Sequence, residues 1–166
     1  MEALNILLYQ SSLYGFAALL LMAAWSDFKQ YLIPNSYVLG ILLLYPAYVM
    51  SAAQPVDWPV ACAIAAGVLA VGILLFATNR IGGGDVKLLA AATLWAGPGF
   101  ASEFLVVTAL AGGVISLALL LRLNYGWVIG WPALTTSRAV PYGVAIAAGG
   151  LFLAARLLML THANQV

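Results

Sequence analysis

The sequence predicts an all-α fold, a polytopic integral membrane helix bundle that forms a single domain over residues 1–166. Hydrophobic residues make up 65% of the chain and charged residues only 7%, whereas soluble domains carry about 25% charged residues. The mean hydropathy is +1.07. A chain of this composition has too little polar surface to cover a water-facing globule, so its expected solvent is a bilayer.

About six membrane segments are expected, because a helix needs ~20 apolar residues to cross a hydrocarbon core ~30 Å thick. The apolar runs, in chain order, are residues 4–25, 34–53, 58–78, 86–96, 101–121 and 140–160. The fourth run is too short to span. It either continues through Gly97-Pro98-Gly99 or is a re-entrant half-helix that would leave Asp85 recessed below the lipid headgroups. Residues 122–138 hold aromatic residues typical of an interfacial loop.

Orientation follows from the basic residues, which gather in cytoplasmic loops. If the loop after the first run is cytoplasmic and the N-terminus outside, five of the six Lys and Arg residues lie inside, and only Arg156 lies outside. The same assignment leaves two acidic residues on the cytoplasmic side, Asp27 and Asp85. The five inner cations are Lys29, Arg80, Lys87, Arg122 and Arg138.

Asp27 and Asp85 are therefore the candidate catalytic residues. Two carboxylates that face each other cannot both ionise comfortably, so at neutral pH the pair can hold one proton. The ionised group can deprotonate a water that attacks a peptide carbonyl, while the protonated group polarises that carbonyl. The single cysteine and single histidine are too few for a C-x-x-C zinc site or a histidine metal site, so no metal and no other cofactor is expected.

Three glycines, Gly82, Gly83 and Gly84, precede Asp85. Without a Cβ they let the backbone approach another backbone or a substrate closely, which would suit an extended peptide beside the acid. An alternative is that Asp85 is an ordinary N-cap of the next helix and that Asp27 is only a polar stop at the end of a span.

Other polar residues lie near both acids. Lys87 could tune the charge of Asp85, contact the peptide or lipid headgroups, or only anchor the chain. A cation there would favour the ionised form of Asp85 and so leave the proton on Asp27. Pro34 would lie early in the second helix, where Asn35 could cap the helix or orient Asp27.

Three segments carry a family resemblance. The stretch WSDFKQYLIPN at residues 25–35 resembles the first aspartate motif of the type IV prepilin peptidases, in which an Asp is followed by Ile-Pro-Asn. GGGDVKL at 82–88 resembles their second motif, Gly-x-Gly-Asp with a following Lys, and VPYGVA at 140–145 resembles a third segment that opens the last helix. The family's catalytic aspartates correspond to Asp27 and Asp85.

The resemblance implies a membrane aspartyl endopeptidase that removes the short basic leader of prepilin-like proteins at the cytoplasmic face of a prokaryotic inner membrane. Prepilin-like substrates and membrane lipid are then the expected partners. Nucleic acid is not expected, since the net charge is only +1. The sequence indicates no oligomeric state. Substrate-binding or supporting roles would fall to Gly82, Gly83, Gly84, Lys87, Asn35 and Pro34.

Larger bifunctional members carry an extra N-terminal region, commonly with a cysteine zinc site, that is linked to N-methylation. This chain begins at its first span and has one cysteine, so no methyltransferase activity is expected. The compact form is most similar to the enzymes of tight-adherence (Flp-type) pilus systems. A peptidase for another pilin class is the alternative within the family.

Two alternatives lie outside that family. The first is a non-catalytic membrane subunit of a pilus assembly or secretion system, in which both Asp residues serve capping or ion binding. The second is a presenilin-like Gly-x-Gly-Asp protease, which this chain resembles only at the second aspartate. Whether Asp27 and Asp85 meet depends on how the helices pack, and a resting state with the two apart is one option.

Overall fold

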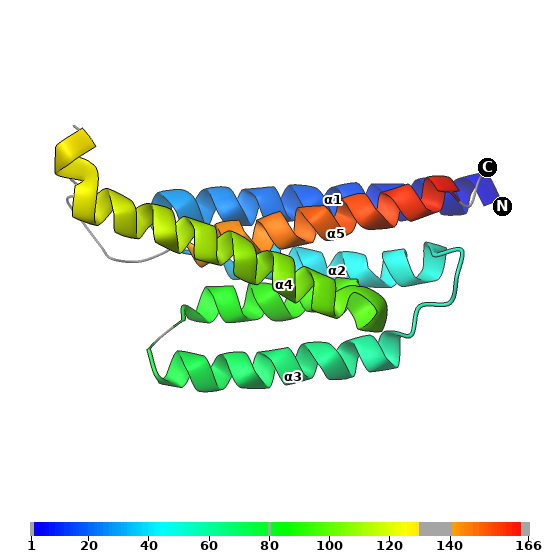
Figure 1. Cartoon of the computed structure of the whole chain (residues 1–166). Coiled ribbons are helices and arrows are strands. Elements are labelled where there is room, and N and C mark those ends of the chain that lie inside the picture. Colours follow the sequence, from blue (N-terminus) through cyan, green and yellow to red (C-terminus); the bar gives the residue numbers. More distant parts are fainter. Residues whose placement is uncertain (1, 80, 130–140, 164–166) are drawn as a thin grey trace.

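The computed structural model describes residues 2–79, 81–129 and 141–163, and over these residues helix is the only regular secondary structure. Figure 1 shows a bundle of long, roughly aligned helices. They are α1 (Glu2–Gln30), α2 (Asn35–Ser51), α3 (Trp58–Ala77), α4 (Gly83–Ile129) and α5 (Tyr142–Ala163).

Four of these helices, α1, α3, α4 and α5, are long and apolar enough to cross a membrane, and α2 is a shorter apolar helix. The expected all-α class, with several apolar helices of membrane-spanning length, is therefore confirmed. Three apolar runs of the sequence correspond closely to α1, α2 and α3, because hydropathy sets where a chain can lie in a bilayer.

The expected count of six segments is not confirmed, because the fourth and fifth runs belong to one element, α4. Gly97 interrupts this helix with φ 57° and ψ −172°, and Pro98 follows it. That conformation suits glycine, and proline lacks the N–H that a continuing helix would need. Figure 1 shows the chain reversing its direction here. Residues 83–96, at 1.5 Å per residue, cover only ~21 Å of a core ~30 Å thick.

The expected interfacial loop at 122–138 is partly wrong, because α4 continues to Ile129. Helical hydrogen bonding does not stop where the apolar run stops, and a polar or aromatic end of a helix can extend beyond the hydrocarbon core. The remainder of that loop, with Arg138, lies outside the described residues, as do Arg80 and the expected start of the last segment at residue 140.

Trp95 is the centre of the core and is 1% exposed. Its ring stacks on Phe16 of α1 with centroids 4.4 Å apart, and lies 5.0 Å from Tyr48 of α2. Its indole N–H donates a hydrogen bond of 3.1 Å to the backbone carbonyl of Ile41, also in α2. A buried aromatic ring with a satisfied polar group thus joins α1, α2 and the first part of α4.

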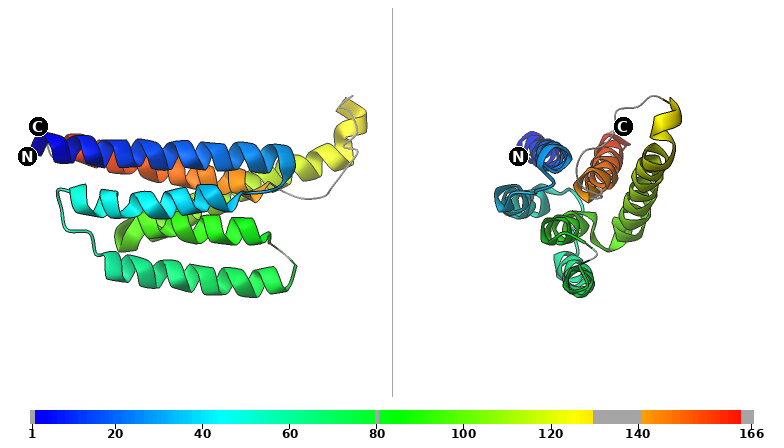
Figure 2. Two further views of the ribbon diagram at one scale, coloured as in Figure 1. Left: turned by 180° about the vertical axis from the view of Figure 1, so that it is seen from behind. Right: turned by 90° about the vertical axis from the view of Figure 1, so that its left-hand side faces the viewer.

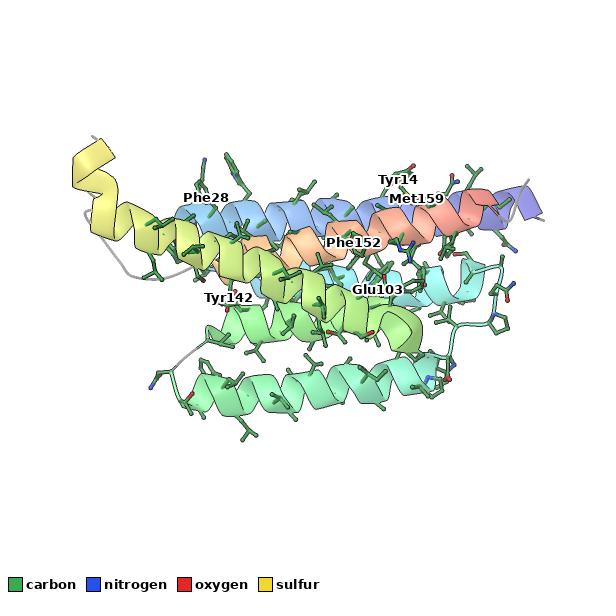
Figure 3. The ribbon with its side chains drawn as sticks, viewed as in Figure 1. Tyr14, Phe28, Glu103, Tyr142, Phe152 and Met159 are labelled. Atoms are coloured by element: carbon green, nitrogen blue, oxygen red, sulfur yellow. The ribbon has the colours of Figure 1, made fainter. Side chains whose placement is uncertain are left out.

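One end of the bundle collects most of the helix ends. The C-terminal ends of α1 and α3 meet the N-terminal ends of α2, α4 and α5 there, and the two chain termini lie at the other end (Figures 1 and 2). In Figure 3, Phe28 and Tyr142, the sequence neighbours of Asp27 and Gly143, lie at the former end, and Met159 lies towards the latter. Loops far apart in the sequence therefore converge.

Arg156, the one basic residue that the positive-inside assignment leaves outside, has an acidic partner. Its Nε lies 3.7 Å from a carboxylate oxygen of Glu103, and both side chains are about half exposed. The guanidinium also lies 6.0 Å from the ring centroid of Phe100. The exception is thus neutralised by a charge on the neighbouring helix, a pairing that the linear sequence did not indicate.

Candidate active site

Asp27 lies in the last turns of α1 and not in a polar turn after it, and it is only 4% exposed. Its backbone carbonyl accepts a hydrogen bond of 2.8 Å from the N–H of Tyr31. Tyr31 has φ 52°, an uncommon conformation for a residue other than glycine, and this left-handed cap ends the helix. The buried carboxylate is therefore held by a rigid helix that ends directly after it.

The Asp27 carboxylate also binds the start of another helix. Its Oδ2 accepts a hydrogen bond of 2.7 Å from the backbone N–H of Gly143, 116 positions away in the sequence. Gly143 is the second residue of α5, where N–H groups have no partner inside the helix and the helix dipole favours a negative charge. Asp27 on α1 thus caps α5.

Gly143 can approach Asp27 this closely only because it lacks a side chain. A Cβ at this position would lie 2.9 Å from Oδ2 and 3.0 Å from Cβ of Asp27. The resemblance placed Gly143 in a segment that opens the last helix, and the structure shows a helix start that also positions the acid. The Pro-Tyr-Gly signal was visible in the sequence, but its partner was not.

Asp85 is the third residue of α4, so it is not the N-cap that the alternative interpretation expected. Its carboxylate accepts a hydrogen bond from the backbone N–H of Gly82, which lies just before the helix. A side chain at the third helical position that reaches back to the N-cap N–H is one half of a capping box. Asp85 is half-buried and is positioned by a contact with its own loop.

The structure brings Asp27 and Asp85 together. Both line one cavity of about 220 Å³, and the two carboxylates are close enough to interact electrostatically. We name this space the carboxylate cavity. Its lining residues come from the end of α1, the loop that leads to α2, the start of α2, and the loop and first turn of α4: Asp27, Tyr31, Leu32, Ile33, Asn35, Gly82, Gly83, Gly84 and Asp85.

Ile33 lies between the start of α4, which carries Asp85, and the start of α5, which holds the Asp27 carboxylate. A Cβ at Gly84 would lie 3.1 Å from Cβ of Ile33, and a Cβ at Gly143 would lie 2.9 Å from its Cδ1. The loop that carries Ile33 is tied to α1, because the Ser26 hydroxyl donates a hydrogen bond of 2.7 Å to the carbonyl of Leu32. Ile33 therefore acts as a spacer that sets the separation between the starts of α4 and α5.

The three glycines before Asp85 differ in their surroundings. A Cβ at Gly82 would lie 2.8 Å from Oδ2 of Asp85, and Gly84 contacts Ile33 as described. Gly83, in contrast, faces the ring of Phe76 on α3 at 3.4 Å, close to an ordinary van der Waals distance. The first and third glycines are thus the ones that close approach requires, which matches the Gly-x-Gly-Asp pattern.

Pro34 occupies the N-cap position of α2, with φ −59° and ψ 137°, and no side chain caps this helix by a hydrogen bond. The expectation that Asn35 caps α2 is therefore wrong, because Asn35 is already the first helical residue. Its Oδ1 instead accepts a hydrogen bond of 3.1 Å from Nζ of Lys87. This contact ties the start of α4 to the start of α2, and the suggestion that Lys87 leaves the proton on Asp27 stays a prediction.

No group of three His, Cys, Asp or Glu side chains within residues 2–79, 81–129 and 141–163 is arranged to hold a metal ion. The polar side chains that line the carboxylate cavity are two carboxylates, the Asn35 amide and the Tyr31 hydroxyl, and backbone N–H groups lie beside them. Such a set can bind and activate water and can hold one proton between the two acids.

Fold and site together define a helical protein with apolar helices of membrane-spanning length and a paired carboxylate site at one end of the bundle. The model of the type IV leader peptidase family matches residues 14–117, which is more than half of the chain and includes both Asp27 and Asp85. The chain belongs to this family, whose activity is that of a peptidase. Searches of curated proteins and of solved structures give no match.

Proposed function

We propose that this protein is a membrane aspartyl endopeptidase in which Asp27 and Asp85 together activate a water molecule. The observation that carries this proposal is the carboxylate cavity, where two acids from different helices face one space. The match to a peptidase family supports the same reaction class. Capping alone would not require the two carboxylates to line the same cavity.

The reaction needs one proton on the pair. The ionised carboxylate takes a proton from water while the water oxygen bonds to the peptide carbonyl carbon, and the protonated carboxyl group donates its proton to the carbonyl oxygen. In the tetrahedral intermediate the C–N bond then breaks. The nitrogen leaves with the proton taken from water, and as the carbonyl re-forms one hydroxyl of the intermediate returns its proton to the second carboxylate. The products are a carboxylic acid and an amine, and the pair is back in its starting state.

The proposed substrates are prepilin-like proteins with a short basic leader, of the tight-adherence (Flp) class. The distribution of basic residues supports placing the carboxylate cavity at the cytoplasmic face of the inner membrane, with the N-terminus on the opposite side. A basic leader would then reach two acids at the membrane surface. The lack of N-methyltransferase activity stays a prediction.

The test is a cleavage assay in membranes with a panel of prepilin-like substrates. We expect Asp27→Asn and Asp85→Asn each to lower the cleavage rate by about 100- to 10,000-fold, because Asn keeps the size of Asp but cannot cycle a proton. Asp57→Asn is the matched control. Asp57 caps α3 at the other end of the bundle, where its Oδ1 accepts a hydrogen bond of 3.3 Å from the N–H of Val60, and Asn is an equally good cap.

A folded Asp27→Asn or Asp85→Asn variant that cuts at a rate close to that of the wild type would show that the changed acid is structural. If the wild-type chain cuts no substrate in the panel, the proposed substrate class is wrong. The alternative, a non-catalytic membrane subunit of a pilus assembly or secretion system, would in addition predict that Asp27→Asn leaves assembly intact.

A further inference from the structure

A second and larger cavity lies beside the carboxylate cavity. It has a volume of about 470 Å³, and Asp85 lines both spaces. We name it the apolar groove, because Asp85 is the only charged residue among the described residues that line it. Its walls come from α3, from both parts of α4 and from the start of α5, for example Ile64, Leu89, Leu105 and Ile146.

The groove follows α3 from the active-site end into the bundle. Its α3 wall is a stripe at helical spacing, from Leu75 through Val71 and Gly67 to Ile64, and this stripe covers ~16 Å at 1.5 Å per residue. Leu75 lies near the C-terminal end of α3, which Figure 1 shows beside the start of α4. A volume of about 470 Å³ is enough for a row of side chains but small for a whole helix of this length, which is ~10 Å across.

Two glycines of α3 shape the groove in different ways. A Cβ at Gly72 would lie 2.5 Å from Cγ1 of Val86, so Gly72 is needed for the close packing of α3 on α4. A Cβ at Gly67 would meet nothing within 4 Å. A Cβ at position 67 therefore fits without a clash, and because Gly67 lines the groove, it is the natural position for a side chain that blocks it.

Thr108 lines the groove, but its hydroxyl is covered and lies against Gly149 of α5. The groove therefore offers an occupant mainly apolar side chains and the one carboxylate of Asp85. This lining suits apolar residues next to the bond that Asp85 would help to cleave.

We propose that the apolar groove binds the apolar residues that adjoin the scissile bond of the peptide substrate, on the side that enters the bilayer. The inference rests on the proposed peptidase function. Because Asp85 is shared, a chain whose scissile bond lies in the carboxylate cavity reaches the groove directly. Substrate selection would then depend on the fit of these residues along α3, in addition to the leader.

The test uses a prepilin that the wild type cuts and a truncated version of it that lacks the apolar residues beyond the cleavage site. Gly67→Phe fills the groove, and Gly113→Phe is the matched control, since a Cβ at Gly113 also meets nothing within 4 Å and Gly113 does not line the groove. We expect Gly67→Phe to lower kcat/KM for the full substrate by about tenfold or more, with a smaller loss for the truncated one. Gly113→Phe should stay within about twofold of the wild type.

A second form of this experiment blocks the groove after the protein has folded. A loss of activity then cannot result from misfolding of the variant. Gly67→Cys and Gly113→Cys are made in a Cys62→Ala background, which removes the single, exposed native cysteine, and are alkylated with a bulky maleimide. Alkylation at position 67 should reproduce the selective loss, and alkylation at position 113 should not.

Equal activity of the two alkylated proteins on the full substrate would overturn the inference and leave the peptidase proposal intact. An equal loss on both substrates would also overturn it, because it would indicate that a lipid chain or the enzyme's own packing occupies the groove. If the wild type cuts nothing, the proposed function itself has failed.

Discussion

The two acids of the carboxylate cavity are positioned in different ways. Asp27 is almost fully buried in α1, and its carboxylate is held by Gly143 from a helix 116 positions further along the chain. Asp85 is half-buried, and its carboxylate is held by Gly82 in the loop directly before it. One half of the site thus depends on tertiary packing and the other on local loop geometry. Damage to the packing of α5 should therefore reach Asp27 first.

The largest expected effect is the loss of cleavage when both acids are replaced, because both are needed for the same proton transfers. The double variant Asp27→Asn/Asp85→Asn should have a cleavage rate within about tenfold of the less active single variant, because the effects of residues that act as one unit are not additive. The measurement is the cleavage rate of all three variants on one substrate. Losses that simply multiply would indicate two independent roles and would break the paired interpretation.

Substitution of the glycines should separate the two halves of the site. Gly143→Ala places a Cβ against Asp27 and Ile33, so we expect about 1–3 kcal/mol of destabilisation together with a loss of cleavage. Gly84→Ala, with its nearest contact at 3.1 Å, should cost less. Thermal unfolding in detergent measures the first quantity, and Gly113→Ala is the neutral control. If Gly84→Ala is the more destabilising change, the contrast between a tertiary contact at Asp27 and a local contact at Asp85 is wrong.

Ile33→Val sharpens this test, since it removes Cδ1, the atom of Ile33 that a Cβ at Gly143 would meet. In the Gly143→Ala background we expect Ile33→Val to recover part of the stability. It should not recover cleavage, because the contact with the Asp27 carboxylate remains. Full recovery of cleavage would show that Ile33, and not Asp27, is the group that Gly143 must avoid.

Loss of the cap on α5 should be smaller. Asp27→Ala leaves the Gly143 N–H without its partner and should destabilise the fold by about 1 kcal/mol, as for other helix caps. Asp85→Ala should destabilise the fold less. Asp85 is only half-buried, and Gly82, whose N–H loses its partner, is exposed and can bind water instead. Urea or thermal unfolding of the two variants gives this difference directly, and a reversed order would contradict it.

The smallest effect concerns the contact between Lys87 and Asn35. Their hydrogen bond joins two exposed side chains, so a double-mutant cycle with Lys87→Met and Asn35→Leu should give a coupling of about 0.5 kcal/mol or less. A large effect of Lys87→Met on cleavage, without a matching effect of Asn35→Leu, would instead indicate that Lys87 acts on the substrate or on Asp85.

Much of the site was predictable from the sequence for physical reasons that act over short distances. Hydropathy located the apolar helices, and the scarcity of acids on one side singled out Asp27 and Asp85. The Gly97-Pro98-Gly99 stretch marked a possible break after the fourth apolar run, and the structure shows that the chain reverses there. These signals depend on a residue and its near neighbours. The family motifs around both acids added the reaction class.

Other features were decided by the tertiary structure alone. The bond from Gly143 to Asp27, the position of Ile33 between two glycines, the pairing of Arg156 with Glu103 and the apolar groove all join helices that are distant in the sequence. Such contacts depend on the rotation and depth of each helix against its neighbours. Hydropathy does not set either quantity, because a lipid-facing and a helix-facing side chain can be equally apolar.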